Sequence, residues 1–173
     1  MYYFKKLFLV IMLFSVLACG KYLPKYSGEA PREISRSEYL NYNFSLLDVT
    51  GKTWSLAKFK KKVVVIQFFS VACKVCIIEA KSYQKEIVDT NYPDIDIVGI
   101  AIRNTKEQVM EWQSTHQIRY PILLDEDGSV FDKFKRINAV PTLVFLTPER
   151  KVHLVEEGYK NPETLKAIAN SII

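Results

Sequence analysis

Two cysteines that lie three positions apart, Cys73 and Cys76, constrain this chain more than any other feature. They follow the apolar, β-branched and aromatic run Val63–Phe69, which predicts a buried strand, and the residues after them predict a helix. Cys73 is therefore expected at a helix N-terminus, where the backbone N–H groups and the helix dipole favour a thiolate. Cys76 is expected close enough to close a small disulfide ring. The order strand, CxxC, helix is typical of thiol–disulfide exchange.

The N-terminus is expected to be a targeting segment rather than part of the fold. Two lysines precede an apolar run at 7–18 that is too short to span a bilayer comfortably, so residues 1–18 are predicted to be a signal peptide. The run VLAC at 16–19 resembles the lipobox of bacterial lipoproteins, in which the peptide is cut before the cysteine and the cysteine carries the lipid. Cys19 is accordingly expected to be lipidated. An ordinary secretory signal and a retained transmembrane anchor are the alternatives.

Lipidation would also account for the odd number of cysteines. The chain has three, and an exported protein with an unpaired third thiol would be reactive. If Cys19 carries a lipid, the other two form one matched pair outside the cytoplasm, where disulfides persist. Residues 19–42 are polar and interrupted by proline and glycine, so they are expected to be a lipidated N-terminus and a flexible tether, followed by one domain at 43–173.

Charge patterning gives no sign of a nucleic-acid partner. The formal net charge is +5, and removal of the two leader lysines lowers it to about +3. The lysines at 58 and 60–62 cluster just before the expected strand, where a solvated turn is the ordinary explanation. No basic stripe with interleaved aromatic residues is present.

Alternating strands and helices predict an α/β fold: a central mixed β-sheet flanked by helices, with an N-terminal β-hairpin. The hairpin is expected at 43–49 and 53–56. Further strands are expected at 63–69, 95–102, 120–124, 142–147 and 152–156, and helices at 73–89, 105–117, 129–137 and 162–172.

Five segments, taken in order, resemble the extracytoplasmic thioredoxin-like proteins of the TlpA/ResA type, which are part of the redoxin group. The resemblance runs from about residue 43 to the C-terminus and implies a thioredoxin-like fold with thiol–disulfide chemistry. The segments read NFSLLDVTGKTWSL, VVVIQFFSVACKVCIIEA, DIVGIAI, YPILLDEDGSVFDKF and AVPTLVFLTPERKV.

The resemblance also implies roles for individual residues. Cys73 matches the more exposed, nucleophilic thiol, and Cys76 matches the resolving thiol. Pro141 matches a loop proline that is cis in thioredoxin-like folds and lies against the disulfide. The backbone of Val140 would then pair with an extended substrate segment.

Glu79 is a further candidate, because it follows Cys76 by three residues and would lie about one helical turn away. Related proteins often have glutamate at this position, where it takes part in thiol proton transfer. Partial burial would raise its pKa toward a useful range. The alternative is a carboxylate exposed to solvent.

Three residues depart from the family pattern. Ala72 replaces the usual tryptophan before the first cysteine. Lys74 stands between the cysteines, where it could lower the pKa of Cys73 and make the disulfide more oxidising, or project into solvent. Gln67 replaces the buried aspartate of thioredoxins proper, which would leave proton handling to Glu79 or water. These departures leave the partner and the direction of electron flow open.

The sequence as a whole favours a lipid-anchored thiol–disulfide oxidoreductase on the outer side of a bacterial membrane. Its expected partners are protein thiols and disulfides of the cell envelope and a membrane electron donor, with no cofactor and no nucleic acid. The resemblance favours a reducing role, for example on apocytochrome thiols during cytochrome c biogenesis.

The competing hypothesis is a non-enzymatic module of the same fold that binds copper as a chaperone or binds a peptide beside Pro141. His116 and His153 are the only histidines, and no ligand-like spacing connects them to the thiols. No metal site is therefore predicted. A peroxidase would need a threonine just before the attacking cysteine, where Ser70 and Val71 stand instead.

Overall fold

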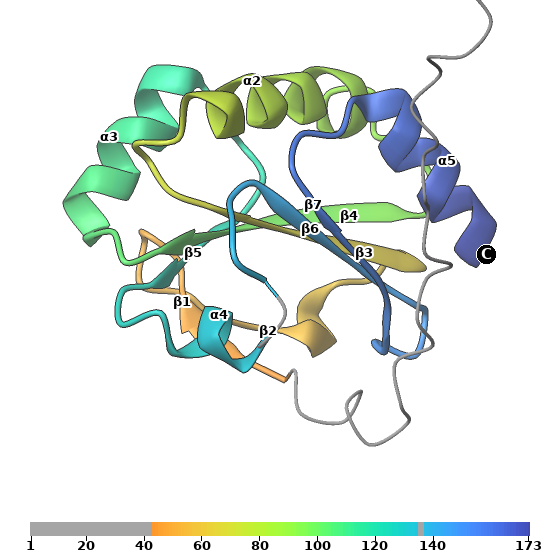
Figure 1. Cartoon of the computed structure of the whole chain (residues 1–173), viewed down its shortest axis with the longest axis horizontal. Helices are drawn as coiled ribbons and strands as arrows, with labels where there is room; N and C mark the ends of the chain where they lie inside the picture. The colour runs from red at the N-terminus through yellow and green to blue at the C-terminus, as the bar shows by residue number, and fades with distance from the viewer. Residues whose placement is uncertain (1–42, 135–136) are drawn as a thin grey trace, which may run out of the picture. The chain divides into compact units, whose positions relative to one another are not determined.

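A five-stranded mixed sheet forms the centre of the computed structural model, which describes residues 43–134 and 137–173 (Figure 1). Strands β3, β4 and β5 are parallel, and β6 is antiparallel to both β3 and β7. The strand order is β5 (Ile122–Asp125), β4 (Ile95–Ile102), β3 (Val63–Phe69), β6 (Thr142–Leu146) and β7 (Val152–Glu157). A separate antiparallel pair consists of β1 (Ser45–Leu47) and β2 (Thr53–Ser55). The mixed sheet and the N-terminal hairpin predicted from the sequence are confirmed.

The predicted signal peptide at 1–18, Cys19 and the tether at 19–42 lie outside the described residues. Among the helices within residues 43–134 and 137–173, none combines the length and the hydropathy needed to cross a membrane.

Strand β3 lies in the middle of the sheet, paired with β4 on one side and β6 on the other. All seven of its residues are buried. Its side chains alternate between two cores, because successive residues of a strand point to opposite faces. Val65 and Phe69 belong to one core, whereas Ile66 and Phe68 belong to the other. This burial on both faces explains the continuous apolar run in the sequence.

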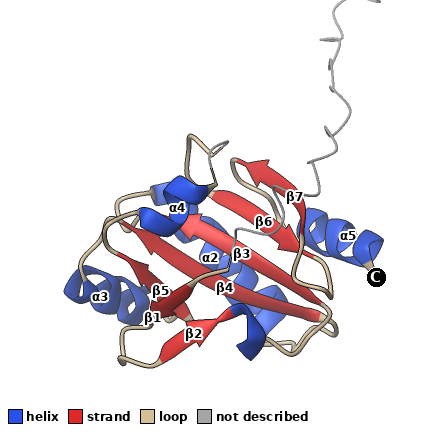
Figure 2. Ribbon diagram, turned by 90° about the horizontal axis from the view of Figure 1, so that it is seen from below, coloured by secondary structure: helices blue, strands red, loops and turns tan. Residues whose placement is uncertain are grey.

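Three helices cover one face of the sheet: α2 (Lys74–Tyr83), α3 (Lys106–His116) and α5 (Pro162–Ile172). They contribute Ala80, Val109 and Leu165 to the core that contains Val65. Figure 1 shows α2 and α5 above the strands, and Figure 2, seen from below, shows α2 behind them. The other face is covered by the hairpin, the short helix α4 (Ser129–Lys133) and the 3₁₀ turn η2 (Leu56–Lys58).

Two helices differ from their predicted extents. The helix expected at 73–89 is regular only to Tyr83 and continues as the π-helical segment η3 (Gln84–Val88). There the side chain of the buried Gln84 accepts a hydrogen bond from the backbone N–H of Arg119. This bond connects the π-helical turn to the loop that follows α3. The helix expected at 129–137 ends at Lys133. Phe134 leaves it and packs into the core below the sheet.

Candidate active site

Cys73 and Cys76 form a disulfide at the junction of β3 and α2, with their Cα atoms 5.2 Å apart. Cys73 is the N-cap residue of α2, and its sulfur accepts a hydrogen bond from the Cys76 backbone N–H at 3.1 Å. Cys73 is partly exposed, whereas Cys76 is fully buried. The geometry therefore leaves the first sulfur accessible to a partner and shields the second. A helix N-terminus also stabilises negative charge on the sulfur once the disulfide is reduced.

The turn that carries Cys73 is fixed by contacts with the end of the neighbouring strand. The Cys73 N–H donates to the Ser70 carbonyl, which closes the turn after β3. The Val71 N–H donates to the side-chain carbonyl of Asn104, a buried residue just after β4. The sulfur thus lies at the carboxyl ends of two parallel strands, a common position for a site in a sheet of this kind.

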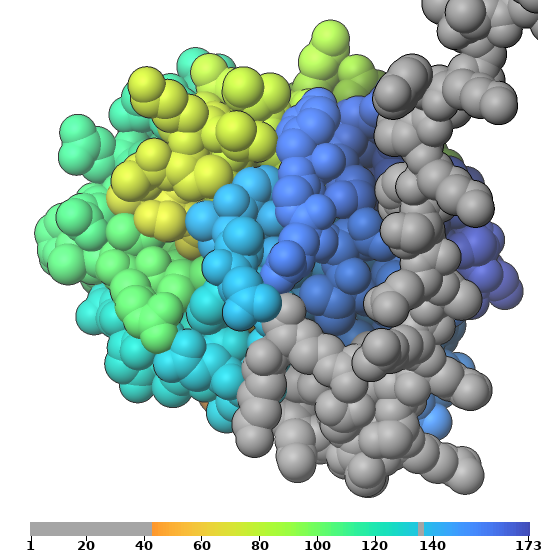
Figure 3. Space-filling model, viewed as in Figure 1, coloured from red at the N-terminus to blue at the C-terminus, as the bar shows by residue number. Residues whose placement is uncertain are grey.

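A loop far along the chain faces the disulfide. The Val140–Pro141 peptide bond is cis, as the resemblance led us to expect, and the Val140 carbonyl oxygen lies 3.9 Å from the Cys73 sulfur. The segment that carries the thiols and the segment around residue 140 lie side by side on one face (Figure 3). The Gly158 N–H donates to the Pro141 carbonyl at 2.8 Å, which fixes the loop to the end of β7.

Glu79 lies on α2 three residues after Cys76 and is completely buried, so the alternative of a solvent-exposed carboxylate is wrong. One carboxylate oxygen accepts a hydrogen bond from the Lys160 backbone N–H at 2.9 Å, and the other accepts from the Gln67 side-chain amide at 2.7 Å. Burial raises the pKa of Glu79, and the hydrogen bonds from Lys160 and Gln67 oppose that rise. A raised pKa favours the protonated form of this carboxyl group relative to that of an exposed one, which suits a group that exchanges protons with a thiol.

A buried hydrogen-bond chain continues from Glu79 through Gln67 to Tyr120. Gln67 is buried, and its side-chain carbonyl accepts a hydrogen bond from the Tyr120 hydroxyl at 2.8 Å. Burial raises the pKa of Tyr120, and the negative charge of Glu79 raises it further, so the phenol remains a donor. Because Tyr120 occupies the amide oxygen, the amide nitrogen of Gln67 is directed at Glu79. That arrangement suits the carboxylate form of Glu79.

The turn between β7 and α5 completes the surroundings of Glu79. The Tyr83 hydroxyl donates to the Lys160 carbonyl at 2.7 Å, so α2 holds both the N–H and the carbonyl of Lys160. Burial raises the pKa of Tyr83, and the nearby Glu79 charge raises it further. The Lys160 ammonium forms an ion pair with Glu156 at 3.2 Å. Sequence reasoning missed Tyr120, Tyr83 and Lys160, but a polar residue in the middle of an apolar strand was a signal for Gln67.

The histidines lie apart from this chemistry. His116 contacts the edge of Trp112, with ring centroids 5.3 Å apart, and His153 is exposed on β7. In the part of the chain that the structure describes, no group of three or more histidine, cysteine, aspartate or glutamate side chains is placed to hold a metal ion.

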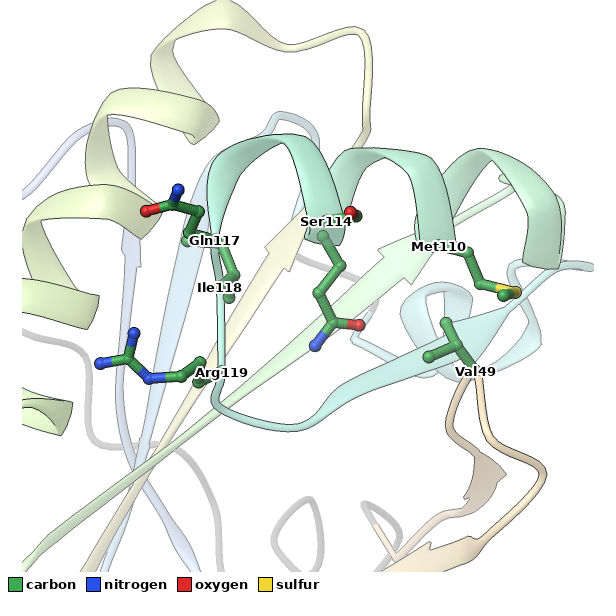
Figure 4. A pocket seen from close by; sticks show the side chains of 7 residues that line it. Val49, Met110, Ser114, Gln117, Ile118 and Arg119 are labelled. Carbon is green, nitrogen blue, oxygen red and sulfur yellow. The ribbon is translucent and has the colours of Figure 1, made fainter.

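A hollow of about 440 Å³ lies along α3 (Figure 4). Its lining contains neither a thiol nor a carboxylate, so we assign it no part in the exchange. The lining residues are Val49, Met110, Gln113, Ser114, Gln117, Ile118 and Arg119.

Comparison with known proteins agrees with this geometry. The family model described as "AhpC/TSA family" matches residues 41–155. The thiol–disulfide oxidoreductase ResA of Bacillus subtilis is 26% identical over 155 residues, which cover 89% of this chain and 86% of ResA.

Solved structures share the fold. A secreted disulfide oxidoreductase of Mycobacterium tuberculosis superposes with a TM-score of 0.64 and 19% identity, over 79% of this chain and 99% of that one. StoA of Bacillus subtilis gives a TM-score of 0.62 and 19% identity, over 72% of this chain and 94% of StoA.

Proposed function

The chain belongs to the AhpC/TSA family and is a thiol–disulfide oxidoreductase, and we propose that it reduces disulfides of protein partners outside the cytoplasm from a lipid-anchored position. The observation that carries the proposal is the accessible Cys73 sulfur, which faces the Val140–Pro141 loop at the start of the helix that carries the buried Glu79. The support for the reducing direction is the resemblance to TlpA/ResA-type proteins.

The proposed exchange proceeds in two steps that conserve electrons and protons. The Cys73 thiolate attacks one sulfur of the partner disulfide, forms a mixed disulfide and releases the first partner thiolate. The Cys76 thiolate then attacks the Cys73 sulfur and releases the second partner thiolate. The partner gains two electrons, and Cys73 and Cys76 return to the disulfide seen in the structure. A membrane electron donor would reduce that disulfide again.

Glu79 is proposed to accept the proton of Cys76 before the second step. Cys76 is fully buried, so its thiol has little access to water. Glu79 lies three residues further along the same helix and has a pKa raised by burial. Gln67 and Tyr120 orient the carboxylate without contacting the partner, so they are positioning residues.

The loop opposite Cys73 is proposed to hold the partner. An extended segment next to the partner disulfide would pair with the backbone of Val140, while Pro141 packs beside the sulfurs. Because Pro141 is buried and its carbonyl is held by Gly158, the loop is arranged before the partner arrives. A pre-organised site loses less entropy on binding.

Anchoring through Cys19 is proposed from the lipobox-like sequence alone. Membrane fractionation of cells that produce the chain with and without Cys19→Ser tests it, together with globomycin, which blocks lipoprotein processing. Release of the variant from the membrane supports the anchor, and a variant that stays membrane-bound contradicts it.

The reduction potential of the Cys73–Cys76 pair tests the direction. Proteins of this fold range from about −270 mV for reductants to about −120 mV for oxidants. Equilibration against glutathione buffers should give a value near the lower limit, together with catalysed reduction of insulin by dithiothreitol. A value near the upper limit would contradict the reducing role, and tight Cu(I) binding without turnover would favour the copper-binding alternative.

A further inference from the structure

The outer face of α2 presents large apolar side chains beside the nucleophile. Val75 is 45% exposed and Ile78 is 60% exposed, whereas Cys76 and Ala80 on the inner side are completely buried. Side chains three positions apart lie on the same face of a helix, so Val75 and Ile78 form one patch. Single exposed apolar residues are ordinary. Val75 and Ile78 differ from such ordinary exposed residues because positively charged side chains lie beside them.

Two lysines border the patch, and neither has an acidic partner among the described residues. Lys74 and Lys81 are exposed, and no ion pair or hydrogen bond engages either ammonium group within residues 43–134 and 137–173. Lys74, Ile78 and Lys81 follow a spacing of four and three residues, which places them on one stripe of the helix. Glu79 is the single acidic residue of α2, and it is buried. The outer face of α2 is therefore both positive and apolar.

The other charged groups near the thiols do not offset this charge. Glu156 forms an ion pair with Lys160, and the Glu157 carboxylate accepts a hydrogen bond from the backbone N–H of Asn138. Glu111 lies on α3, where it lines a separate hollow that adjoins the turn before Cys73. None of these three carboxylates lies on α2, so a partner would meet unpaired positive charge on the α2 side of Cys73.

We propose that the surface formed by Lys74, Val75, Ile78 and Lys81 docks a protein segment that carries acidic and apolar residues next to its disulfide. The proposal rests on the exchange function, because a disulfide that reaches the Cys73 sulfur brings its flanking residues against this face. Contact removes water from the ammonium groups, which favours a partner that supplies carboxylates. The apolar flanking residues cover Val75 and Ile78, as expected at the centre of an interface.

Rates of disulfide exchange with designed peptides test the proposal. The protein is the full chain with Cys19→Ser, reduced and kept in detergent. The probes are two cyclic disulfide peptides with the same leucine beside a cysteine, one flanked by glutamates and one by lysines, and the small neutral compound bis(2-hydroxyethyl) disulfide. At low ionic strength the acidic peptide should react about tenfold faster than the basic one. The difference in rate between the two peptides should shrink in 0.5 M salt, where the electrostatic screening length falls to about 4 Å.

Charge and apolar variants locate the effect. Lys81→Glu should remove most of the preference for the acidic peptide and leave the reaction with the neutral compound unchanged. The matched control Lys151→Glu changes an exposed lysine in the turn between β6 and β7, at the opposite end of the sheet, and should keep the preference. Ile78→Gln should slow both peptides severalfold without affecting the neutral compound.

Three outcomes overturn the proposal, and they are distinguishable. Equal rates for the two peptides, or a preference that persists in Lys81→Glu, exclude the docking surface while the exchange function stands. No reaction with any of the three probes, the neutral compound included, excludes the exchange function and the docking surface with it.

Discussion

The side-chain amide of Gln67 donates a hydrogen bond of 2.7 Å to the carboxylate of Glu79, and neither residue has any exposed surface. The pair joins the central strand to the helix that begins at the thiols. Tyr120 occupies the other end of the amide. The carboxylate form of Glu79 accepts this hydrogen bond, whereas the protonated form has an O–H that needs an acceptor. The side-chain amide of Gln67 presents its N–H₂ donor at that position. Protonation of Glu79 is therefore coupled to the orientation of the Gln67 amide.

Glu79→Gln should slow the second step of exchange, in which Cys76 releases the partner. The substitution keeps the shape of the side chain but removes the group that accepts the Cys76 proton. A loss of about 100-fold near neutral pH is expected, since general acid–base groups contribute at least that much. Single-turnover measurements between pH 5 and 9 give the rate profile. The exposed Glu157→Gln is the control, and an unchanged profile in Glu79→Gln would exclude a role in proton transfer.

The stability of the oxidised protein should depend on pH through Glu79. Its pKa is raised above the ordinary value of 4.5, so the folded state holds a proton that the unfolded state releases. The contribution is fully present below pH 4.5 and is lost as pH rises through the folded-state pKa, with a slope of at most about 1.4 kcal/mol per pH unit. Wild type should therefore lose stability relative to Glu79→Gln over that range in urea unfolding. A stability difference between wild type and Glu79→Gln that stays constant with pH would contradict a raised pKa for Glu79.

Tyr120→Phe should raise the pKa of Glu79 still further. Without the Tyr120 hydroxyl, Gln67 can turn its oxygen toward Glu79 and accept a hydrogen bond from the protonated form. The pH profile of the second step should shift to higher pH, and the free energy of unfolding should fall by about 1–3 kcal/mol. Tyr92→Phe, which removes a hydroxyl bonded to Asn170 on the surface, is the control. A loss of stability without any shift of the profile would assign Tyr120 a purely structural role.

Lys81→Glu should raise the pKa of His116. Burial lowers that pKa, and the positive charge of Lys81 lowers it further. Reversal of the charge removes the repulsion and adds an attraction. NMR titration of the imidazole, with Lys151→Glu as the control, measures the shift independently of any partner. A pKa that does not move would mean that Lys81 points away from α3.

The sequence predicted the elements that local pattern determines. Strand β3 could be predicted because its burial on both faces produces a continuous apolar run, and the position of Cys73 followed from the helix after it. The resemblance supplied the loop with Pro141. The assignments of a signal peptide, a lipidated Cys19 and a tether within residues 1–42 stay predictions.

The surroundings of Glu79 could not be predicted in the same way. Its two hydrogen-bond partners come from β3 and from the turn before α5, and Tyr120, which holds Gln67, lies in the loop just before β5. No periodicity in the sequence brings these segments together. The position of Glu79 in the sequence, three residues after Cys76, is compatible with either the exposed or the buried side of α2. Only the packing of α2 against the sheet decides between these positions. The same packing leaves Ile78 exposed, which its apolar character does not predict.

The central claim is that Cys73 attacks and Cys76 resolves, and trapping of the mixed disulfide tests it most directly. Full-length reduced protein with Cys19→Ser and Cys76→Ser is incubated with a disulfide-bonded protein such as insulin, and the adduct is mapped by mass spectrometry. Our account predicts a stable adduct on Cys73. The companion variant with Cys73→Ser should form almost none, because Cys76 is buried. An adduct that forms equally well on Cys76, or no adduct on Cys73, would contradict it.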